Sequence, residues 1–117
     1  MYDCFLDIEE LPNTISKEET IYLFNNFNEK NRQKIIKSNL RLVASEVMNV
    51  FKANYSNKLE LFQMGVEGLI NAVDHFDLTK NVCFSTYAKK CIDNRIINFI
   101  REKDDEIQFF SLYDTLI

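Results

Sequence analysis

The chain has 117 residues, a formal net charge of −4 and a hydrophobic content of 46%. Its length allows one domain with a real core, and its apolar content excludes a disordered chain. Two glycines, one proline, three cysteines and one histidine argue against hairpin-rich folds, a disulfide framework and a zinc site.

The composition therefore favours an all-α fold in a reduced, cytoplasmic setting. No signal peptide and no apolar stretch of membrane-spanning length is found. Residues 1–15 are expected to form an acidic lead-in. Ser16 and Glu19 form a capping-box pattern, in which Ser16 bonds the third helical amide and Glu19 reaches back, and this predicts a short helix to about residue 27.

Apolar residues at steps of three and four predict a second helix over about 29–53. Asn57 is the expected N-cap of a third helix, about 58–75, and a fourth helix is expected over about 84–103. The prediction is thus a compact helical bundle of about four main helices, with no structure assigned to residues 107–117.

Gly65 and Gly68 lie inside the third predicted helix, where each costs about 1 kcal/mol relative to alanine. Two explanations are open. The glycines allow close packing within the fold, or they let a helix of another protein approach the exposed side.

Residues 76–101 carry the most informative pattern. A Phe-Asp turn leads through a short loop into Phe84-Ser85-Thr86-Tyr87. The helix that follows carries Lys89, Lys90, Asn94, Arg95 and Arg101. Aromatic side chains beside a basic helix are suited to hold an unstacked DNA base and to follow the adjacent backbone.

Charge is concentrated in the same part of the chain. Residues 80–103 contain six bases and two acids, whereas residues 1–20 contain six acids and one lysine. A local basic surface on an acidic body indicates binding that depends on context or on a partner.

Three strings, in order and in register, identify a family resemblance. They are Asn39-Leu40-Arg41-Leu42-Val43, the segment 61–77 (LFQMGVEGLINAVDHFD) and Phe84-Ser85-Thr86-Tyr87-Ala88. The chain resembles the conserved second domain of the sigma-70 family of bacterial RNA polymerase initiation factors. The resemblance implies an acidic lead-in at 1–15, this domain at 16–105, and at 106–117 the start of a linker towards a third domain.

Neither the third domain nor the helix-turn-helix domain for the −35 element follows in the sequence. The expectation is therefore an excised domain, a split or truncated gene product, or a small protein that works with a partner.

The resemblance implies one face for RNA polymerase. Glu60, Gln63 and Ile70 would face the coiled coil of the polymerase clamp. Glu60 keeps the charge of the usual aspartate, whereas Met64 departs from a position that is often acidic. From the residues alone, Glu60 and Gln63 belong to a solvated helix face.

The resemblance also implies a pocket for the second base of the −10 promoter element, flipped from the duplex. The matching residues are Phe76, Lys80, Phe84, Thr86 and Tyr87. Flipping costs a few kcal/mol and one aromatic stack returns about 1–3 kcal/mol, so hydrogen bonds and phosphate contacts must contribute. Phe76 and Phe84 are alternatively core residues, and Tyr87 is the preferred stacking residue.

A second pocket, for the last −10 base, would use Asn39, Leu42 and Ser85. On the fourth predicted helix, the outward positions are Lys90, Asn94, Ile97 and Arg101. Asparagine reads adenine bidentately and isoleucine contacts a thymine methyl. Lys89, Lys90 and Arg101 would mostly bind phosphate, which positions the protein without specifying sequence.

Departures from the family pattern indicate the type of member. Housekeeping members carry a tryptophan pair, which wedges the duplex open, where this chain has Lys90-Cys91. Asn81 and Cys83 also replace the usual glycine and lysine of the loop. The sequence therefore resembles an alternative, sporulation-type factor with weaker melting and stricter promoter choice.

Two functions are weighed on this basis. The first is a binding module, without catalysis, cofactor or metal, that joins core RNA polymerase and the single-stranded −10 non-template DNA to recognise and melt promoters. The second is a docking module that occupies the clamp or binds an anti-sigma factor without opening DNA. A helical bundle of unrelated role is the third, generic reading, and no membrane partner is expected.

Overall fold

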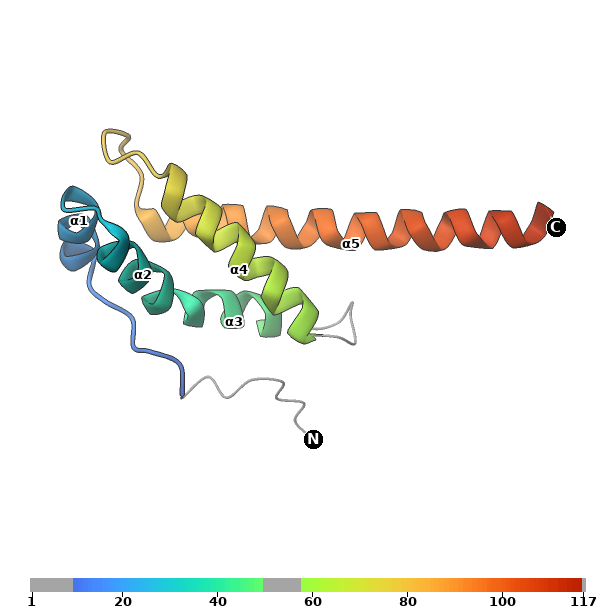
Figure 1. The fold of residues 1–117 in the computed structure, drawn as a ribbon, viewed down its shortest axis with the longest axis horizontal. Helices are drawn as coiled ribbons and strands as arrows, with labels where there is room; N and C mark the ends of the chain where they lie inside the picture. Colours follow the sequence, from blue (N-terminus) through green and yellow to red (C-terminus); the bar gives the residue numbers. More distant parts are fainter. Residues whose placement is uncertain (1–9, 50–57, 117) are drawn as a thin grey trace.

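The computed structural model describes residues 10–49 and 58–116, with side chains placed up to residue 103. The described residues form five helices and no strand, which confirms the all-α prediction. The helices are α1 (Lys17–Asn25), α2 (Glu29–Ser38), α3 (Leu40–Asn49), α4 (Lys58–His75) and α5 (Phe84–Leu116). In Figure 1, the four shorter helices gather along the first half of α5. None of the helices in these residues is long and apolar enough to cross a membrane.

Side-chain caps begin the first two helices. The Ser16 hydroxyl accepts a hydrogen bond from the Glu19 amide at 3.0 Å, as the capping-box pattern predicts. The Glu19 carboxylate pairs with Lys34 on α2 at 2.8 Å. Asn28 caps α2 by accepting from the Asn31 amide at 2.8 Å.

The single helix predicted over 29–53 is wrong, because the chain breaks at Asn39 into α2 and α3. Asn39 adopts φ −110° and ψ 7°, and its side-chain amide donates to the Ile35 carbonyl at 2.8 Å. Asparagine competes in this way with the helical backbone. The apolar periodicity did not reveal the break because both helices bury their apolar residues in the same core. Residues 50–53 and the predicted cap Asn57 lie outside the described residues.

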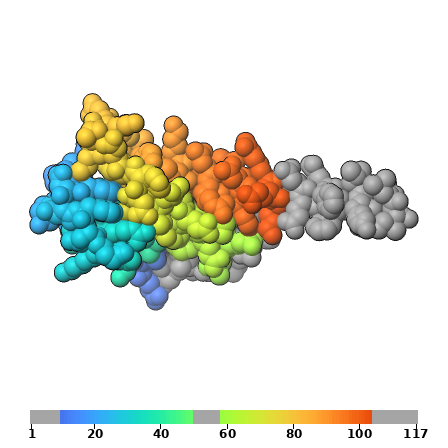
Figure 2. Space-filling view, turned by 45° about the horizontal axis from the view of Figure 1, so that its top comes forward, coloured from blue at the N-terminus to red at the C-terminus, as the bar shows by residue number. Residues whose placement is uncertain are grey.

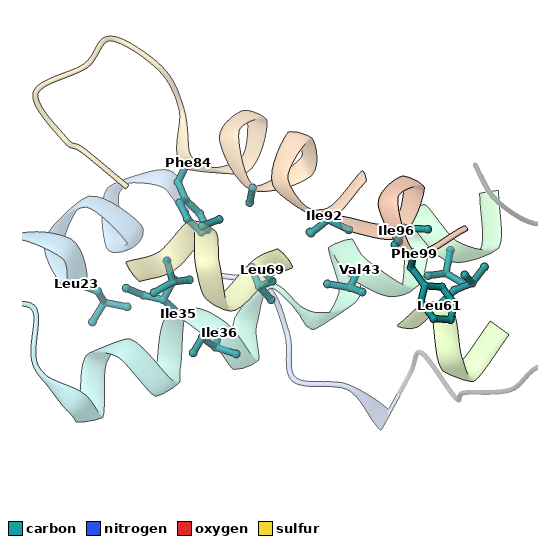
Figure 3. Close-up of a cluster of buried hydrophobic side chains, with 14 residues drawn as sticks. Leu23, Ile35, Ile36, Val43, Leu61, Leu69, Phe84, Ile92, Ile96 and Phe99 are labelled. Carbon is teal, nitrogen blue, oxygen red and sulfur yellow. The ribbon is translucent and has the colours of Figure 1, made fainter. Parts of the chain in front are cut away.

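One apolar core joins all five helices (Figure 3). Leu23 and Ile35 lie near Phe84 at one end of the cluster, and Leu61 lies near Phe99 at the other. Each fully buried leucine or isoleucine stabilises the fold by about 1.5–3 kcal/mol. The side of α5 that faces this core carries Ala88, Ile92, Ile96 and Phe99, all buried.

Gly65 and Gly68 are packing residues. A Cβ atom on Gly65 would lie 2.6 Å from Val43 Cγ1, and one on Gly68 would lie 2.7 Å from the Cys91 carbonyl oxygen. Both distances are shorter than a non-bonded contact of a Cβ atom allows, so the absence of a side chain at the two glycines lets α4 approach α3 and α5. Close packing within the fold is therefore the explanation that holds.

A bidentate ion pair between Arg32 and Asp74 fixes the C-terminal end of α4. Arg32 Nε lies 2.7 Å from Asp74 Oδ1 and Arg32 Nη2 lies 3.0 Å from Asp74 Oδ2. These hydrogen bonds from Arg32 hold the pKa of Asp74 below its usual range. They join α2 to α4 across 42 positions of sequence.

α5 continues without interruption to Leu116, well past the predicted end near residue 103. No glycine or proline occurs after residue 68, so nothing in the sequence breaks the helix. The boundary predicted between residues 105 and 106 lies inside α5, and so do residues 106–116 of the segment 106–117, which was expected to begin a linker.

Candidate nucleic-acid interface

The connection between α4 and α5, residues 76–83, is a hydrogen-bonded turn. Asp77 Oδ1 accepts from the Thr79 hydroxyl at 2.6 Å and from the Thr79 amide at 2.9 Å. These bonds and the nearby Lys80 lower the pKa of Asp77. Figure 2 shows the connection, in yellow, projecting beside the helices α1 and α2.

Four aromatic rings from three parts of the chain meet beneath this turn. The ring centroid of Phe24 on α1 lies 4.9 Å from that of Phe76 and 5.1 Å from that of Phe84. Phe76 meets Phe84 edge-on at 5.2 Å and Tyr87 at 5.7 Å. These separations fall in the range of favourable aromatic pairs, each worth about 0.5–1.5 kcal/mol beyond burial.

The rings differ in exposure, which separates their possible roles. Phe84 is only 6% exposed. Of its two interpretations, base-pocket residue or core residue, the second describes its packing. Phe76 and Tyr87 are half-buried against that core. Burial, and then the neighbouring Cys91 thiol, raises the pKa of Tyr87. The Tyr87 hydroxyl therefore stays protonated at neutral pH and remains a hydrogen-bond donor.

A cavity of about 300 Å³ lies between α1 and the turn. Its floor is aromatic, from Phe24, Phe76 and Phe84, and its lining includes the cations Lys17 and Lys80 but no acid. Thr86 is exposed on the first turn of α5, and Tyr87 is in ring contact with Phe76. A flat apolar group attached to an anion matches this combination of aromatic floor and cationic rim.

A smaller cavity of about 160 Å³ adjoins the first one and shares Lys17, Thr20, Cys83 and Phe84 with it. Asn39 and Ser85 both line this cavity, so the structure brings together two of the three residues predicted for a second pocket. Leu42 is instead half-buried against the core and is not part of this lining.

The outward positions of α5 form a mixed polar face. Lys89, Lys90, Asn94 and Arg101 are exposed, whereas Ile97 is half-buried against the core. The spacing predicted the exposed positions Lys90, Asn94 and Arg101, but not the partial burial of Ile97.

The face predicted for polymerase lies on α4. Gln63 is exposed and Glu60 and Ile70 are half-buried. Ile70 also lines a groove of about 460 Å³ between α4 and α5, together with Asn94. The two predicted faces therefore meet at this groove, which is crossed by the ion pair between Arg95 and Glu67 at 3.1 Å.

A buried carboxylate lies behind the basic helix. Glu46 on α3 is 6% exposed, and its Oε1 and the Oδ1 of Asp93 on α5 are buried without a hydrogen-bond partner. Burial, and then the neighbouring Asp93 carboxyl group, raises the pKa of Glu46 to about 7, although Lys89 opposes the shift. Sequence reasoning missed this pair because a single glutamate in an apolar helix gives no sign of its partner.

The described residues contain no group of three or more histidine, cysteine, aspartate or glutamate side chains that could hold a metal ion. The arrangement consists of cavities, aromatic rings and cations, a combination that suits binding of a flat, anionic ligand.

Comparison with known proteins identifies the class of this arrangement. The family model for Sigma-70 region 2 matches residues 35–106, which span the end of α2 to the middle of α5. The chain therefore belongs to the sigma-70 family.

Individual relatives indicate which type of sigma-70 family member the chain resembles. The RNA polymerase sigma-G factor of Clostridium acetobutylicum is 41% identical over 103 residues, covering 86% of this chain and 40% of that protein. The sigma-G factor of Bacillus subtilis is 36% identical over 105 residues, with the same coverages. The sigma-E factor of C. acetobutylicum is 34% identical over 111 residues, covering 92% of this chain and 47% of that protein. The resemblance to sporulation-type factors is confirmed, and the chain spans less than half the length of these relatives.

Sequence reasoning missed the contribution of α1 to the site. Lys17, Thr20 and Ile21 line the larger cavity, and Phe24 completes the aromatic cluster. Helical spacing places these residues on neighbouring turns of α1. Nothing in the sequence, however, indicates that α1 packs against a loop about 55 residues further along the chain.

Proposed function

We propose that this chain binds core RNA polymerase and, in that complex, recognises and melts the −10 promoter element. The second −10 base enters the cavity between α1 and the α4–α5 turn, and the last base enters the adjoining cavity at Asn39 and Ser85. The proposed module, residues 16–105, performs no catalysis and requires no cofactor.

The observation that carries this proposal is the pair of adjoining cavities, one with an aromatic floor and a lysine on each side. A flipped base needs a ring to stack on and a cation for its phosphate, because stacking alone returns about 1–3 kcal/mol against a cost of a few kcal/mol. Phe76 lines the cavity and contacts the half-buried ring of Tyr87, which is the proposed stacking ring, and Phe76 in turn packs against Phe84. Lys80 and Lys17 supply the cations.

Tyr87→Ala should weaken binding of the single-stranded −10 non-template DNA to the polymerase complex by about 1–3 kcal/mol, because the stacking ring is lost. Tyr87→Phe should keep most of the affinity, since it loses only the hydroxyl. Fluorescence anisotropy with a labelled oligonucleotide measures both. Permanganate footprinting of a promoter should then show open bases with Phe and none with Ala.

Two controls make this test decisive. Circular dichroism establishes that both variants are folded, and co-purification establishes that both still join the polymerase. If the wild-type chain joins the polymerase and yet binds no single strand there, the melting function is refuted.

A second prediction concerns the outer face of α5. Asn94→Ala should relax base preference at the upstream end of the −10 element by about 1–3 kcal/mol, because a bidentate base contact is lost. Lys89→Ala should weaken all sequences alike and lower the salt slope of binding by about 1. Competition among duplexes that differ at single positions, with the polymerase complex, measures both effects.

The position of Asn94 in the groove between α4 and α5 suggests a result that would contradict this prediction. Asn94 lines that groove beside Ile70, a residue proposed for the polymerase contact. If Asn94→Ala weakens assembly with polymerase and leaves base preference unchanged, the residue belongs to the polymerase face and not to the DNA face.

The alternative function is a docking module that occupies the polymerase clamp, or binds an anti-sigma factor, without opening DNA. Two observations favour it: Lys90-Cys91 stands where the wedge of aromatic residues is usual, and Phe84 is buried in the core. This function predicts that Gln63, Glu60 and Ile70 matter for assembly, while Tyr87→Ala changes nothing beyond stability.

A further inference from the structure

The cavity between α1 and the α4–α5 turn has two walls, and helix α2 contributes no lining residue to either of them. Phe24 belongs to the wall from α1 and Phe76 to the wall from the turn, and their ring centroids lie 4.9 Å apart. The contacts that hold these two walls relative to each other therefore determine the shape of the aromatic floor.

Two ion pairs connect α2 to these walls. Lys34 pairs with Glu19 on α1 at 2.8 Å, and Arg32 binds Asp74 at the end of α4 through hydrogen bonds of 2.7 Å and 3.0 Å. Positions two apart on a helix point about 200° apart around its axis, so the two side chains reach different neighbouring helices. α2 thus joins the wall from α1 to the helix from which the other wall begins.

The two ion pairs differ in how precisely they fix a position. The side chains of Lys34 and Glu19 are 54% and 40% exposed, and a lysine ammonium is a point charge on a flexible stem. Arg32 is only 26% exposed, and its planar guanidinium makes two hydrogen bonds to one carboxylate, which fixes direction as well as distance. Asp74 stands two residues before Phe76, so the more rigid of the two connections leads to the aromatic floor.

We propose that Arg32 is a positioning residue of the base cavity: by fixing Asp74, it places the ring of Phe76 for the second −10 base. The inference rests on the function proposed above, since it names the residue that holds the shape of that cavity. Arg32 is not part of the lining and acts only through Asp74. Partly exposed ion pairs contribute little to stability, so breaking this one should alter the cavity more than it destabilises the domain.

The test measures the contribution of single bases to binding, on the complex of the full chain with core polymerase. Three single-stranded −10 non-template oligonucleotides are compared: one intact, one abasic at the second position and one abasic at the last position. In wild type, each abasic site should weaken binding by about fivefold or more, the effect of one lost base contact. In Arg32→Gln, the penalty at the second position should fall below about twofold, whereas the penalty at the last position should remain.

A purely structural role would not change the ratio of these affinities. Destabilisation lowers the fraction of binding-competent protein, which weakens all three oligonucleotides by the same factor. Arg32→Lys provides a second variant, which keeps the charge but cannot make the paired hydrogen bonds. It should retain only part of the penalty at the second position.

Two further variants locate the effect in the contact with Asp74. Asp74→Asn should reproduce the loss, and the double variant Arg32→Gln/Asp74→Asn should lose no more than either single one, because all three break the same contact. Glu29→Gln is the matched control. It removes the other partner of Arg32, 3.4 Å away within α2, and should keep the ratios of wild type.

The outcomes separate this inference from the underlying function. If the abasic site at the second position weakens binding equally in wild type and Arg32→Gln, the positioning role is wrong and the proposed function stands. Equal reductions of both penalties would also overturn it, because Arg32 would then support the domain as a whole. A full penalty in Arg32→Lys would mean that charge alone suffices and would refute the paired geometry. If the abasic site has no effect in wild type, the proposed function of the cavity itself fails.

Discussion

Gly68→Ala should lower the free energy of unfolding by about 1–3 kcal/mol, although alanine favours helices by about 1 kcal/mol over glycine. The new methyl group would lie 2.7 Å from the Cys91 carbonyl oxygen and 3.0 Å from Ile92 Cα. Because both atoms belong to the backbone of α5, no side-chain rotation relieves the contact and the two helices must separate. Urea denaturation followed by circular dichroism measures the loss.

Two matched substitutions test the cause. Asn71→Ala, at an exposed position of α4, should change stability little. Gly65→Ala meets a side-chain methyl, Val43 Cγ1, so Val43→Ala should recover part of its cost in a double-mutant cycle. A Gly68→Ala protein as stable as wild type would contradict the close approach of α4 and α5.

Glu46→Gln should stabilise the protein at pH 8 by about 1–3 kcal/mol and have little effect at pH 5. The pKa of Glu46 is about 7 in the folded chain and 4.5 in the reference state, and each unit corresponds to about 1.4 kcal/mol. Because the folded-state pKa is the higher one, the stabilising contribution of the protonated carboxyl is complete below about pH 4.5. It is lost as the pH rises through about 7.

The measurement is the free energy of unfolding of wild type and Glu46→Gln between pH 5 and 8. Glu102→Gln, which removes an exposed carboxylate from α5, is the control for the loss of a surface charge. A Glu46→Gln effect of the same size at both ends of the range would contradict the burial of an ionisable carboxyl between α3 and α5.

Local patterns predicted much of this fold. The bounds of α4 agree with the structure because an apolar stripe of helical period fills its whole length. Ser16 predicted the start of α1 because a cap needs only residues three positions apart. Asn39 was not recognised as a break, since its own side chain closes α2 while the apolar period continues into α3.

The candidate site was only partly predictable, because some of its contacts join positions far apart in the sequence. Asn39 and Ser85 were predicted together from the family resemblance, and the structure places them in one cavity. Phe24 escaped because its contacts with Phe76 and Phe84 join positions more than 50 residues apart.

Through the aromatic cluster, α1 closes one side of the cavity between α1 and the α4–α5 turn. α1 buries a single residue, Leu23, and is otherwise held mainly by the ring of Phe24 and the pair of Glu19 with Lys34. A helix with so few buried contacts is among the first to open locally. Because α1 forms one wall of the cavity, any ligand that fills it adds its own binding free energy to the closed form. Binding of a ligand in the cavity and docking of α1 against the core are therefore thermodynamically coupled.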